Sequence, residues 1–171
     1  KAIEGQTFAR AFELGLLYMD ARRLEDARAA LDSVPRTHPD YVPFDLAIRI
    51  LGGEGANRLF GVLRSDRGLT YGASADLNAY ESAGDVIAET DTRSSATGES
   101  LRLMVDEFSR LQREAVNPNE LRGAQDFLAG NFPLTVETPG AIAQQVLAHL
   151  FFGLDLSEIE TYRDRVERVT T

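Results

Sequence analysis

Two different periods run through the pattern of hydrophobic and polar residues in this chain. Over most of its length apolar residues recur every three or four positions, which is the period of an amphipathic helix. Between residues 70 and 92 small or apolar residues instead alternate with polar ones, in TYGASADLN and DVIAETDT. This period of two is typical of half-buried antiparallel strands, and the connection AYESAG around Gly84 predicts that they form a hairpin.

Helices are predicted on both sides of the hairpin. One runs from Pro43, a residue that suits a first helical position, to Gly52 and Gly53, and another crosses ANRLFGVLRSD. A long amphipathic helix is predicted within residues 94–116. Its apolar face is expected to consist of Leu101, Val105, Phe108 and Leu111.

Capping patterns mark the first residues of two later helices. In NPNE, residues 117–120, an asparagine can cap the helix, a proline occupies the first turn and a glutamate stands at the third position. Thr138 and Pro139 repeat this arrangement for a helix that ends at Gly153, and a charged helix, DLSEIETYRDRVERVT, follows. Together these elements predict an α+β fold, with a small antiparallel sheet covered by several helices.

Residues 1–33 are predicted to form a separate helical hairpin. Apolar residues at helical spacing flank a polar turn at residues 20–22. Over about residues 8–41 the spacing resembles one tetratricopeptide repeat. A single repeat cannot bury its own apolar face, so a helical pair packed on its own domain is the equal alternative. We therefore expect a domain boundary near residue 34, with a second domain over residues 34–171.

Composition excludes several classes of function. The net charge is -9 and the chain has one lysine, whereas a nucleic-acid surface needs clustered Lys and Arg, so no nucleic-acid partner is expected. Without cysteines, disulfides and thiolate sites are excluded. No apolar run approaches the about 18 residues of a membrane span, so we expect a soluble protein, of either the bacterial cytoplasm or the periplasm. The opening KAIEGQTFAR has neither Met nor a signal-peptide pattern, and we expect the chain to be part of a longer polypeptide.

Catalytic motifs are absent from the sequence. The two histidines, His38 before a proline and His149 among apolar residues, form no paired-histidine zinc motif, and no calcium-binding loop is present. We interpret His38 as a loop residue and His149 as a core residue. A nucleophile elbow and a phosphate loop are also missing. No metal, cofactor or catalysis is therefore expected on this chain alone.

One combination of motifs resembles a known family. Two segments carry the resemblance, RTHPDYVPFDLAIRILGGEGANRLFGVLRSDRGLTYGASA and GNFPLTVETPGAIAQQVLAHLFFGLDLSEIETYRDRVERVT. They are similar to the C-terminal, zinc-free half of the pitrilysin, insulinase and mitochondrial processing peptidase family of inverted-zincin metallopeptidases. The matching features are HPDY before a helix, the LGG stop, RLF, and LR followed by GLTYG. The resemblance covers about residues 34–171. It implies an inactive domain that faces a zinc-bearing partner domain or subunit, with the zinc on that partner half.

The resemblance also implies which residues act. In the family the zinc-free half supplies an arginine and a tyrosine, which correspond here to Arg64 and Tyr71, with Arg67 as the competing arginine. A guanidinium can hold a substrate carbonyl or carboxylate, and a phenol can donate to a developing oxyanion. We therefore expect this corner to bind an extended peptide substrate and complete the partner's active site. The structural alternative is that Arg64 pairs with Asp66 or Glu54 and that Tyr71 is a half-buried strand residue.

One departure from the family pattern bears on function. A helical hairpin stands where the family usually has a strand or more, so the sheet is expected to be smaller, to be completed by another chain or to lack an edge strand. The second hypothesis is therefore an inert peptidase-like scaffold that binds a protein partner through residues 1–33. A free-standing hydrolase is a weaker third hypothesis, and a homo-oligomer is a further option for the assembly.

Overall fold

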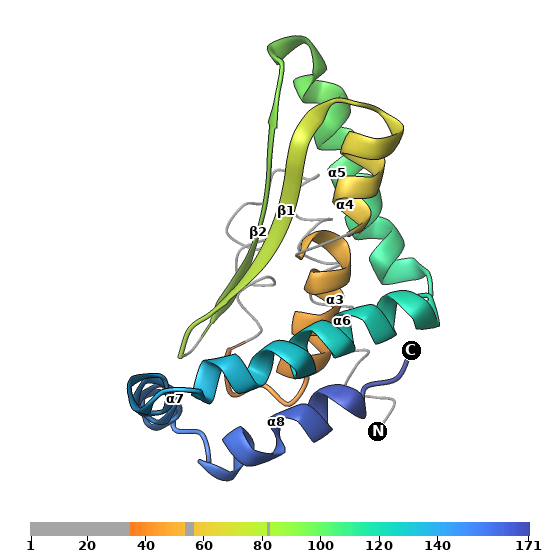
Figure 1. Ribbon diagram of the computed structural model, residues 1–171. Coiled ribbons are helices and arrows are strands. Elements are labelled where there is room, and N and C mark those ends of the chain that lie inside the picture. Colours follow the sequence, from red (N-terminus) through yellow and green to blue (C-terminus); the bar gives the residue numbers. More distant parts are fainter. Residues whose placement is uncertain (1–34, 54–56, 82) are drawn as a thin grey trace.

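A hairpin of two antiparallel strands forms the sheet in the part of the chain that the structure describes. Strand β1 (Thr70–Ala79) pairs with β2 (Gly84–Thr92), and Ala75 lies opposite Ala88. The hairpin predicted from the alternating pattern is therefore confirmed. Figure 1 shows it as a long ribbon along one side of the helices.

The described part of the chain excludes the N-terminal segment. The computed structural model describes residues 35–53, 57–81 and 83–171. The helical hairpin predicted over residues 1–33 lies outside these ranges, and the domain boundary near residue 34 stays a prediction as well.

Helices make up most of the remaining described chain. They are α3 (Tyr41–Gly52), α4 (Arg58–Phe60), the π-helix η1 (Gly61–Asp66), the 3-10 turn η2 (Ser94–Ala96), α5 (Thr97–Arg113), α6 (Pro118–Asn131), the 3-10 helix η3 (Phe132–Val136), α7 (Pro139–Phe152) and α8 (Ser157–Glu167). In Figure 1, α3, α4 and α5 lie on one side of the hairpin, and α6 and α8 run side by side beyond them. This arrangement confirms an α+β fold with a small antiparallel sheet covered by helices.

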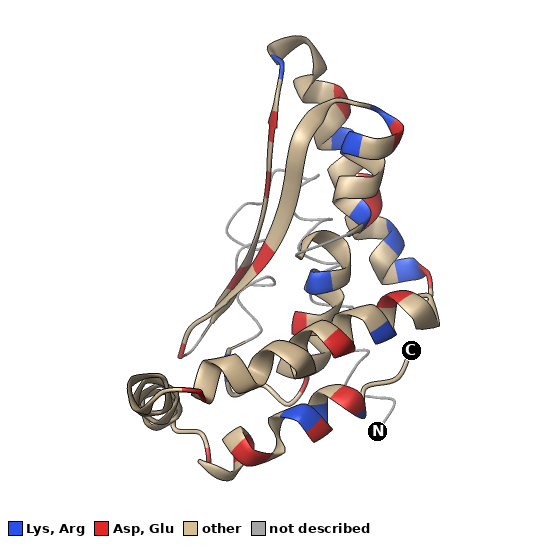
Figure 2. Ribbon diagram, in the orientation of Figure 1, with Lys and Arg blue, Asp and Glu red and all other residues tan. Residues whose placement is uncertain are grey.

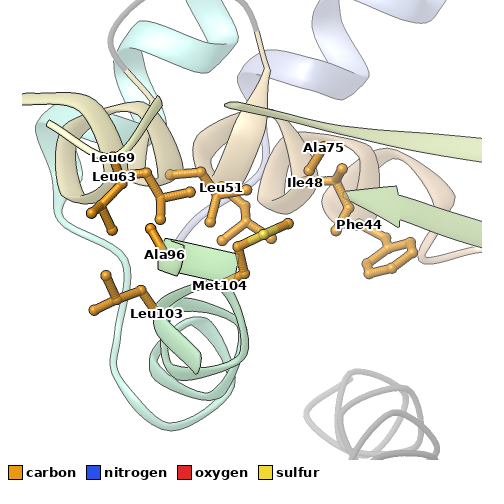
Figure 3. Close-up of a cluster of buried hydrophobic side chains, with 10 residues drawn as sticks. Phe44, Ile48, Leu51, Leu63, Leu69, Ala75, Ala96, Leu103 and Met104 are labelled. Carbon is orange, nitrogen blue, oxygen red and sulfur yellow. The ribbon is translucent and has the colours of Figure 1, made fainter. Parts of the chain in front are cut away.

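A first cluster of buried apolar side chains joins α3 to β1, α5 and the segment α4–η1. Its members are Phe44, Ile48, Leu51, Leu59, Leu63, Leu69, Ala75, Ala96, Leu103 and Met104. In Figure 3, Met104 of α5 points toward Leu51 of α3. Because Leu51, Leu59 and Leu63 are completely shielded from solvent, each stabilises the fold by about 1.5–3 kcal/mol. The cluster therefore fixes the segment that leads into β1.

A second, smaller cluster joins another side of α3 to α6 and α8. Val42 and Leu46 of α3 pack with Leu128 of α6 and Val166 of α8. The side-chain amide of Gln125 donates a hydrogen bond of 2.9 Å to the carbonyl oxygen of Val166, near the end of α8. Such a terminal carbonyl has no partner within its own helix. Helix α3 is thus buried on two sides, and it holds the sheet and the C-terminal helices together.

The buried face of α5 differs from the predicted one. Leu101 and Val105 are 62% and 49% exposed, so this part of the prediction was wrong, while Phe108 and Leu111 are partly buried against the first cluster. The buried residues of α5 are Ser100, Leu103, Met104 and Glu107. Ser100 and Glu107 are polar and interrupt the apolar pattern on this face of the helix. The sequence pattern therefore predicted that the neighbouring, more regularly apolar face would be buried.

The helix starts predicted from capping patterns are confirmed. Asn117 forms a capping box with Glu120 at the start of α6. The side chain of Thr138 accepts a backbone hydrogen bond of 3.2 Å at the start of α7. Helix α3 instead begins at Tyr41, two residues before the predicted start. Pro43 still lies in the first turn, where its missing N–H needs no intrahelical partner.

Helix α7 combines an exposed apolar surface with a buried histidine. It carries no Asp, Glu, Lys or Arg, and Leu147, Leu150 and Phe151 are each more than 60% exposed. His149 is buried, and its Nδ1 donates to the carbonyl oxygen of Gln145 at 2.8 Å, since a carbonyl can only accept. The core interpretation of His149 is therefore confirmed. Within the described residues, no helix has the length and apolar character needed to cross a membrane.

Candidate functional site

The segment between η1 and β1 carries the three candidate residues. Arg64 lies in the π-helical turn Gly61–Asp66, and Arg67 follows that turn. Gly68 then adopts the left-handed conformation, with φ +60°, which ends the helix, and the buried Leu69 leads into β1. A π-helical turn holds one residue more than an α-helical turn would, and such turns are frequent at functional sites.

Strand β1 begins with a second irregularity, a β-bulge. Between Thr70 and Ala73, β1 has two intervening residues, whereas the facing part of β2 has one. The extra residue is therefore Tyr71 or Gly72. The hydroxyl of Thr90, on β2, donates a hydrogen bond of 3.1 Å to the carbonyl oxygen of Gly72. A bulge changes the direction in which nearby side chains point, and bulges are over-represented beside active sites.

The structure brings Arg64 and Tyr71 together at the surface. The Arg64 Cζ lies 5.7 Å from the centroid of the Tyr71 ring and 4.8 Å from that of Phe60, both within the range of cation–π contact. Tyr71 is 91% exposed, so it is not the half-buried strand residue of the structural alternative. In the described part of the chain Arg64 pairs with no carboxylate, Asp66 included, and Glu54 lies outside that part.

Arg67, the competing arginine, interacts with a different element. Its Nη1 lies 3.8 Å from Oε1 of Glu99, in the first turn of α5, and both side chains are exposed. An exposed pair of this kind contributes at most about 1 kcal/mol. Of the two arginines, it is Arg64 whose guanidinium contacts the Tyr71 ring.

The chemistry available at this corner is hydrogen-bond donation. A guanidinium has five N–H donors and a phenol has one O–H, and here both groups lie on an edge anchored by the buried side chains of Leu63 and Leu69. Such donors can hold a carbonyl oxygen, a carboxylate or a developing oxyanion. No three His, Asp or Glu side chains among the described residues lie close enough together to hold a metal ion.

Sequence reasoning missed both backbone irregularities that shape the corner. The available signal was a group of threonines at the ends of the two strands. The hydroxyl of Thr92 donates to the carbonyl oxygen of Leu69 at 2.7 Å, and the hydroxyl of Thr70 lies 2.6 Å from the carbonyl oxygen of Asp91. Threonine is common in any strand, so its presence alone does not distinguish a bulge from a regular ladder.

Comparison with known proteins identifies the class of domain that carries this corner. Residues 23–128 match the family profile of the peptidase M16 inactive domain. The chain therefore belongs to this family, and the resemblance to the zinc-free half of the inverted-zincin metallopeptidases is confirmed. The matched domain is the inactive one, and the zinc of the family lies on its partner half.

Individual proteins support the same assignment. The chain is 25% identical over 97 residues to an uncharacterized zinc protease, YmxG, of Bacillus subtilis (strain 168), which covers 56% of this chain and 24% of that protein. It is 29% identical, with a TM-score of 0.75, to the crystal structure of a peptidase M16 inactive domain from Pseudomonas fluorescens, over 81% of this chain and 33% of that one. A conserved protein from Enterococcus faecalis V583 shares the fold, with 18% identity and a TM-score of 0.73 over 80% of this chain and 32% of that one. The chain thus spans a third or less of these relatives.

Proposed function

We propose that this chain binds extended peptide at the Arg64–Tyr71 corner and completes the active site of a zinc-bearing partner domain or subunit. The observation that carries the proposal is the placement of an arginine without a carboxylate partner in the described chain beside a tyrosine that is 91% exposed. At this exposure the Tyr71 hydroxyl is accessible to a ligand, to which a phenol can donate a hydrogen bond. Membership of the inactive-domain family supports a division in which one half holds the metal and the other helps to hold the substrate.

The two side chains suit different parts of a peptide bond undergoing hydrolysis. A zinc ion on the partner half supplies the Lewis acid and the activated water of such a reaction. Tyr71 donates its phenolic proton in a hydrogen bond to the carbonyl oxygen that becomes negative. Arg64 binds a neighbouring carbonyl or carboxylate of the substrate through its paired N–H donors. Neither residue removes a proton from water, so neither cleaves a peptide without the partner.

The hairpin offers an edge for an extended substrate. Within the described sheet each strand pairs with one neighbour, which leaves backbone N–H and C=O groups along the outer edge of β1. A peptide in the extended conformation can add to such an edge as a further strand. Because Tyr71 lies near the first residue of β1, a peptide on this edge reaches the corner at one end of the strand.

The test measures cleavage of an unstructured fluorogenic peptide by the chain assembled with a zinc-bearing half that contains H-x-x-E-H. The isolated chain is expected to bind no zinc and to leave the peptide intact, and the assembly is expected to cleave it. Tyr71→Phe should lower kcat by about 10²-fold, because it removes one oxyanion donor. Arg64→Ala should lower kcat/KM by at least about tenfold, because it removes a charge-assisted hydrogen bond to the substrate.

Two matched variants serve as controls. Arg67→Ala removes the other exposed arginine of the corner, and Tyr80→Phe removes the hydroxyl of an exposed tyrosine at the opposite end of β1. Both should keep the activity of the wild-type assembly. Full activity of both Arg64→Ala and Tyr71→Phe would refute the site, and stoichiometric zinc on the isolated chain would refute the accessory role. The scaffold hypothesis predicts instead that deletion of residues 1–33 abolishes partner binding while these substitutions change nothing.

A further inference from the structure

A second concave site lies among the helices, apart from the Arg64–Tyr71 corner. It is a cavity of about 510 Å³ between α3, α6, η3, α7 and α8. This volume falls within the usual range of small-molecule sites. None of the residues that line it belongs to the corner or to the hairpin, so the cavity is independent of the proposed peptide site.

The walls of the cavity are partly aromatic and apolar. Phe127 lies on α6, Phe132 and Leu134 on η3, and Ile159 on α8. The rings of Phe132 and Tyr162 pack with their centroids 4.7 Å apart. Leu134, on η3, is 63% exposed, although its side chain faces the cavity and would be covered by an occupant. A flat or branched apolar group fits a lining of this kind.

The charged side chains of the cavity carry more positive than negative charge. Three arginines and two carboxylates are among its lining residues. Figure 2 marks Lys and Arg in blue and Asp and Glu in red along the ribbon. Those carboxylates already have partners: the Arg49 Nε lies 3.5 Å from Oδ1 of Asp45, and Arg165 donates to Oε2 of Glu158. The third arginine is Arg36. A local excess of cations contrasts with the whole chain, whose net charge is -9.

Arg36 forms no ion pair with a carboxylate of the described residues, although it lies near enough to Asp45 for the two charges to interact. Its Cζ lies 4.2 Å from the centroid of the Tyr41 ring, on the wall of the cavity. An aromatic ring is at most a weak hydrogen-bond acceptor, so this contact positions the guanidinium without using its N–H donors. The terminal nitrogens of Arg49 are similarly not used by the ion pair that its Nε makes with Asp45.

We propose that this cavity binds a small carboxylate ligand with an aromatic or branched apolar body. Arg36 and Arg49 bind the carboxylate, and the apolar body lies against Phe127, Phe132 and Leu134. A planar guanidinium is the side chain that best matches two carboxylate oxygens. The cavity thereby gives this inactive domain a ligand-binding role of its own.

The experiment titrates the ¹⁵N-labelled 171-residue chain with 3-phenylpropionate and follows chemical shifts by NMR. The neutral isostere 3-phenylpropionamide and the body-free anion acetate are titrated in parallel. The carboxylate with the aromatic body should bind at least about tenfold more tightly than either analogue, because only it uses both halves of the site. Its largest shifts should fall on residues of α3, η3 and α8 around the cavity. Equal affinity for acid and amide would overturn the proposal, as would shifts confined to the hairpin.

Charge variants at Leu134 provide a test that replaces no arginine, so it does not depend on whether an arginine variant of the protein still folds. Leu134→Glu and Leu134→Lys change a residue that is 63% exposed, and Leu147→Glu is a control on α7, at a position 68% exposed that does not line the cavity. Both variants lose the same apolar contact and differ in charge, so Leu134→Glu should bind 3-phenylpropionate at least about threefold more weakly than Leu134→Lys, with Leu147→Glu at the wild-type value. Arg36→Met should weaken binding about tenfold, whereas Arg163→Met, at an exposed arginine of α8 outside the cavity, should not. Identical affinities across the Leu134 pair and Arg36→Met would refute the site.

Discussion

Gly52 lies so close to strand β1 that no side chain fits between them. A Cβ at Gly52 would lie 2.5 Å from the Cβ of Ala75, and closer still to the backbone nitrogen of that residue. Ala75 is itself buried, so the last turn of α3 packs directly on the sheet. The LGG sequence therefore does more than end a helix, because its first glycine allows helix and strand to approach.

This contact predicts a large loss of stability in Gly52→Ala. The added methyl group meets backbone atoms, which cannot move aside as a flexible side chain would, so we expect a cost of about 3 kcal/mol in the free energy of unfolding. Denaturation by urea measures this. Gly123→Ala is the control, because Gly123 lies within α6 with no atom near its missing Cβ. That variant should be stabilised by about 0.5–1 kcal/mol, and a similar gain in Gly52→Ala would contradict the packing argument.

A bidentate ion pair between Arg58 and Glu120 joins α4 to the start of α6. The Arg58 Nε donates to Oε1 of Glu120 at 2.9 Å, and Nη2 donates to Oε2 at 2.8 Å. Arg58 has a side chain only 10% exposed, so loss of its partner leaves a nearly buried charge unpaired. We expect Glu120→Gln to lower the free energy of unfolding by about 2 kcal/mol at neutral pH. Glu137→Gln, at an exposed position, should change it by less than about 0.5 kcal/mol.

The same pair predicts a dependence on pH. Hydrogen bonds from Arg58 lower the pKa of the Glu120 carboxyl below its ordinary value of 4.5, against a smaller effect of burial. A lowered pKa contributes stability that is fully present above 4.5 and is lost as the pH falls through the folded value. The difference between wild type and Glu120→Gln should therefore shrink in acid. A difference of constant size from neutral pH to pH about 3 would argue against this linkage.

Substitutions of Gly68 test how strongly the stability of the corner depends on backbone conformation. With φ at +60°, it lies in the left-handed region, where a Cβ is unfavourable. Gly68→Ala should destabilise the chain by about 1 kcal/mol, and Gly68→Asn by less, since asparagine tolerates this conformation. Thermal unfolding of the three proteins ranks them. Equal melting temperatures for the alanine and glycine forms would show that the corner can end its helix in another way.

Tyr162 predicts a loss of stability in alkali. Burial, with a further contribution from the nearby charge of Asp45, raises the pKa of Tyr162 to about 12 from its ordinary value of 10.0. A raised pKa contributes stability that is present below 10 and is lost as the pH rises toward 12. Above pH 10, wild type should therefore lose stability more steeply than Tyr162→Phe, by up to about 1.4 kcal/mol per pH unit. Parallel curves from denaturant unfolding at several pH values would contradict the shift.

The position of the candidate site followed from the sequence, but its geometry did not. Helix-to-strand pattern and family motifs located Arg64 and Tyr71 on one corner, seven residues apart. Their contact also depends on the π-helical turn before the corner and on the bulge after it. Each of these adds one residue to a regular element, and no residue type in GVLRSDRGLTYG requires either. The cavity at Arg36 was not predicted at all, because its lining residues come from segments far apart in the chain.

By itself the sequence determined which of the longer described segments are helices and which are strands, and several of their ends. Alternation predicted the two strands, and Asn117 and Thr138 marked the first residues of α6 and α7, because a capping side chain bonds a backbone N–H only two or three residues away. Only the tertiary structure decided which stripe of α5 is buried. Two stripes, one through Leu101 and Val105 and the other through Leu103 and Met104, are similar in apolar character. Burial depends on which surface the helix meets, and that surface is built by α3, α4 and η1 from another part of the chain.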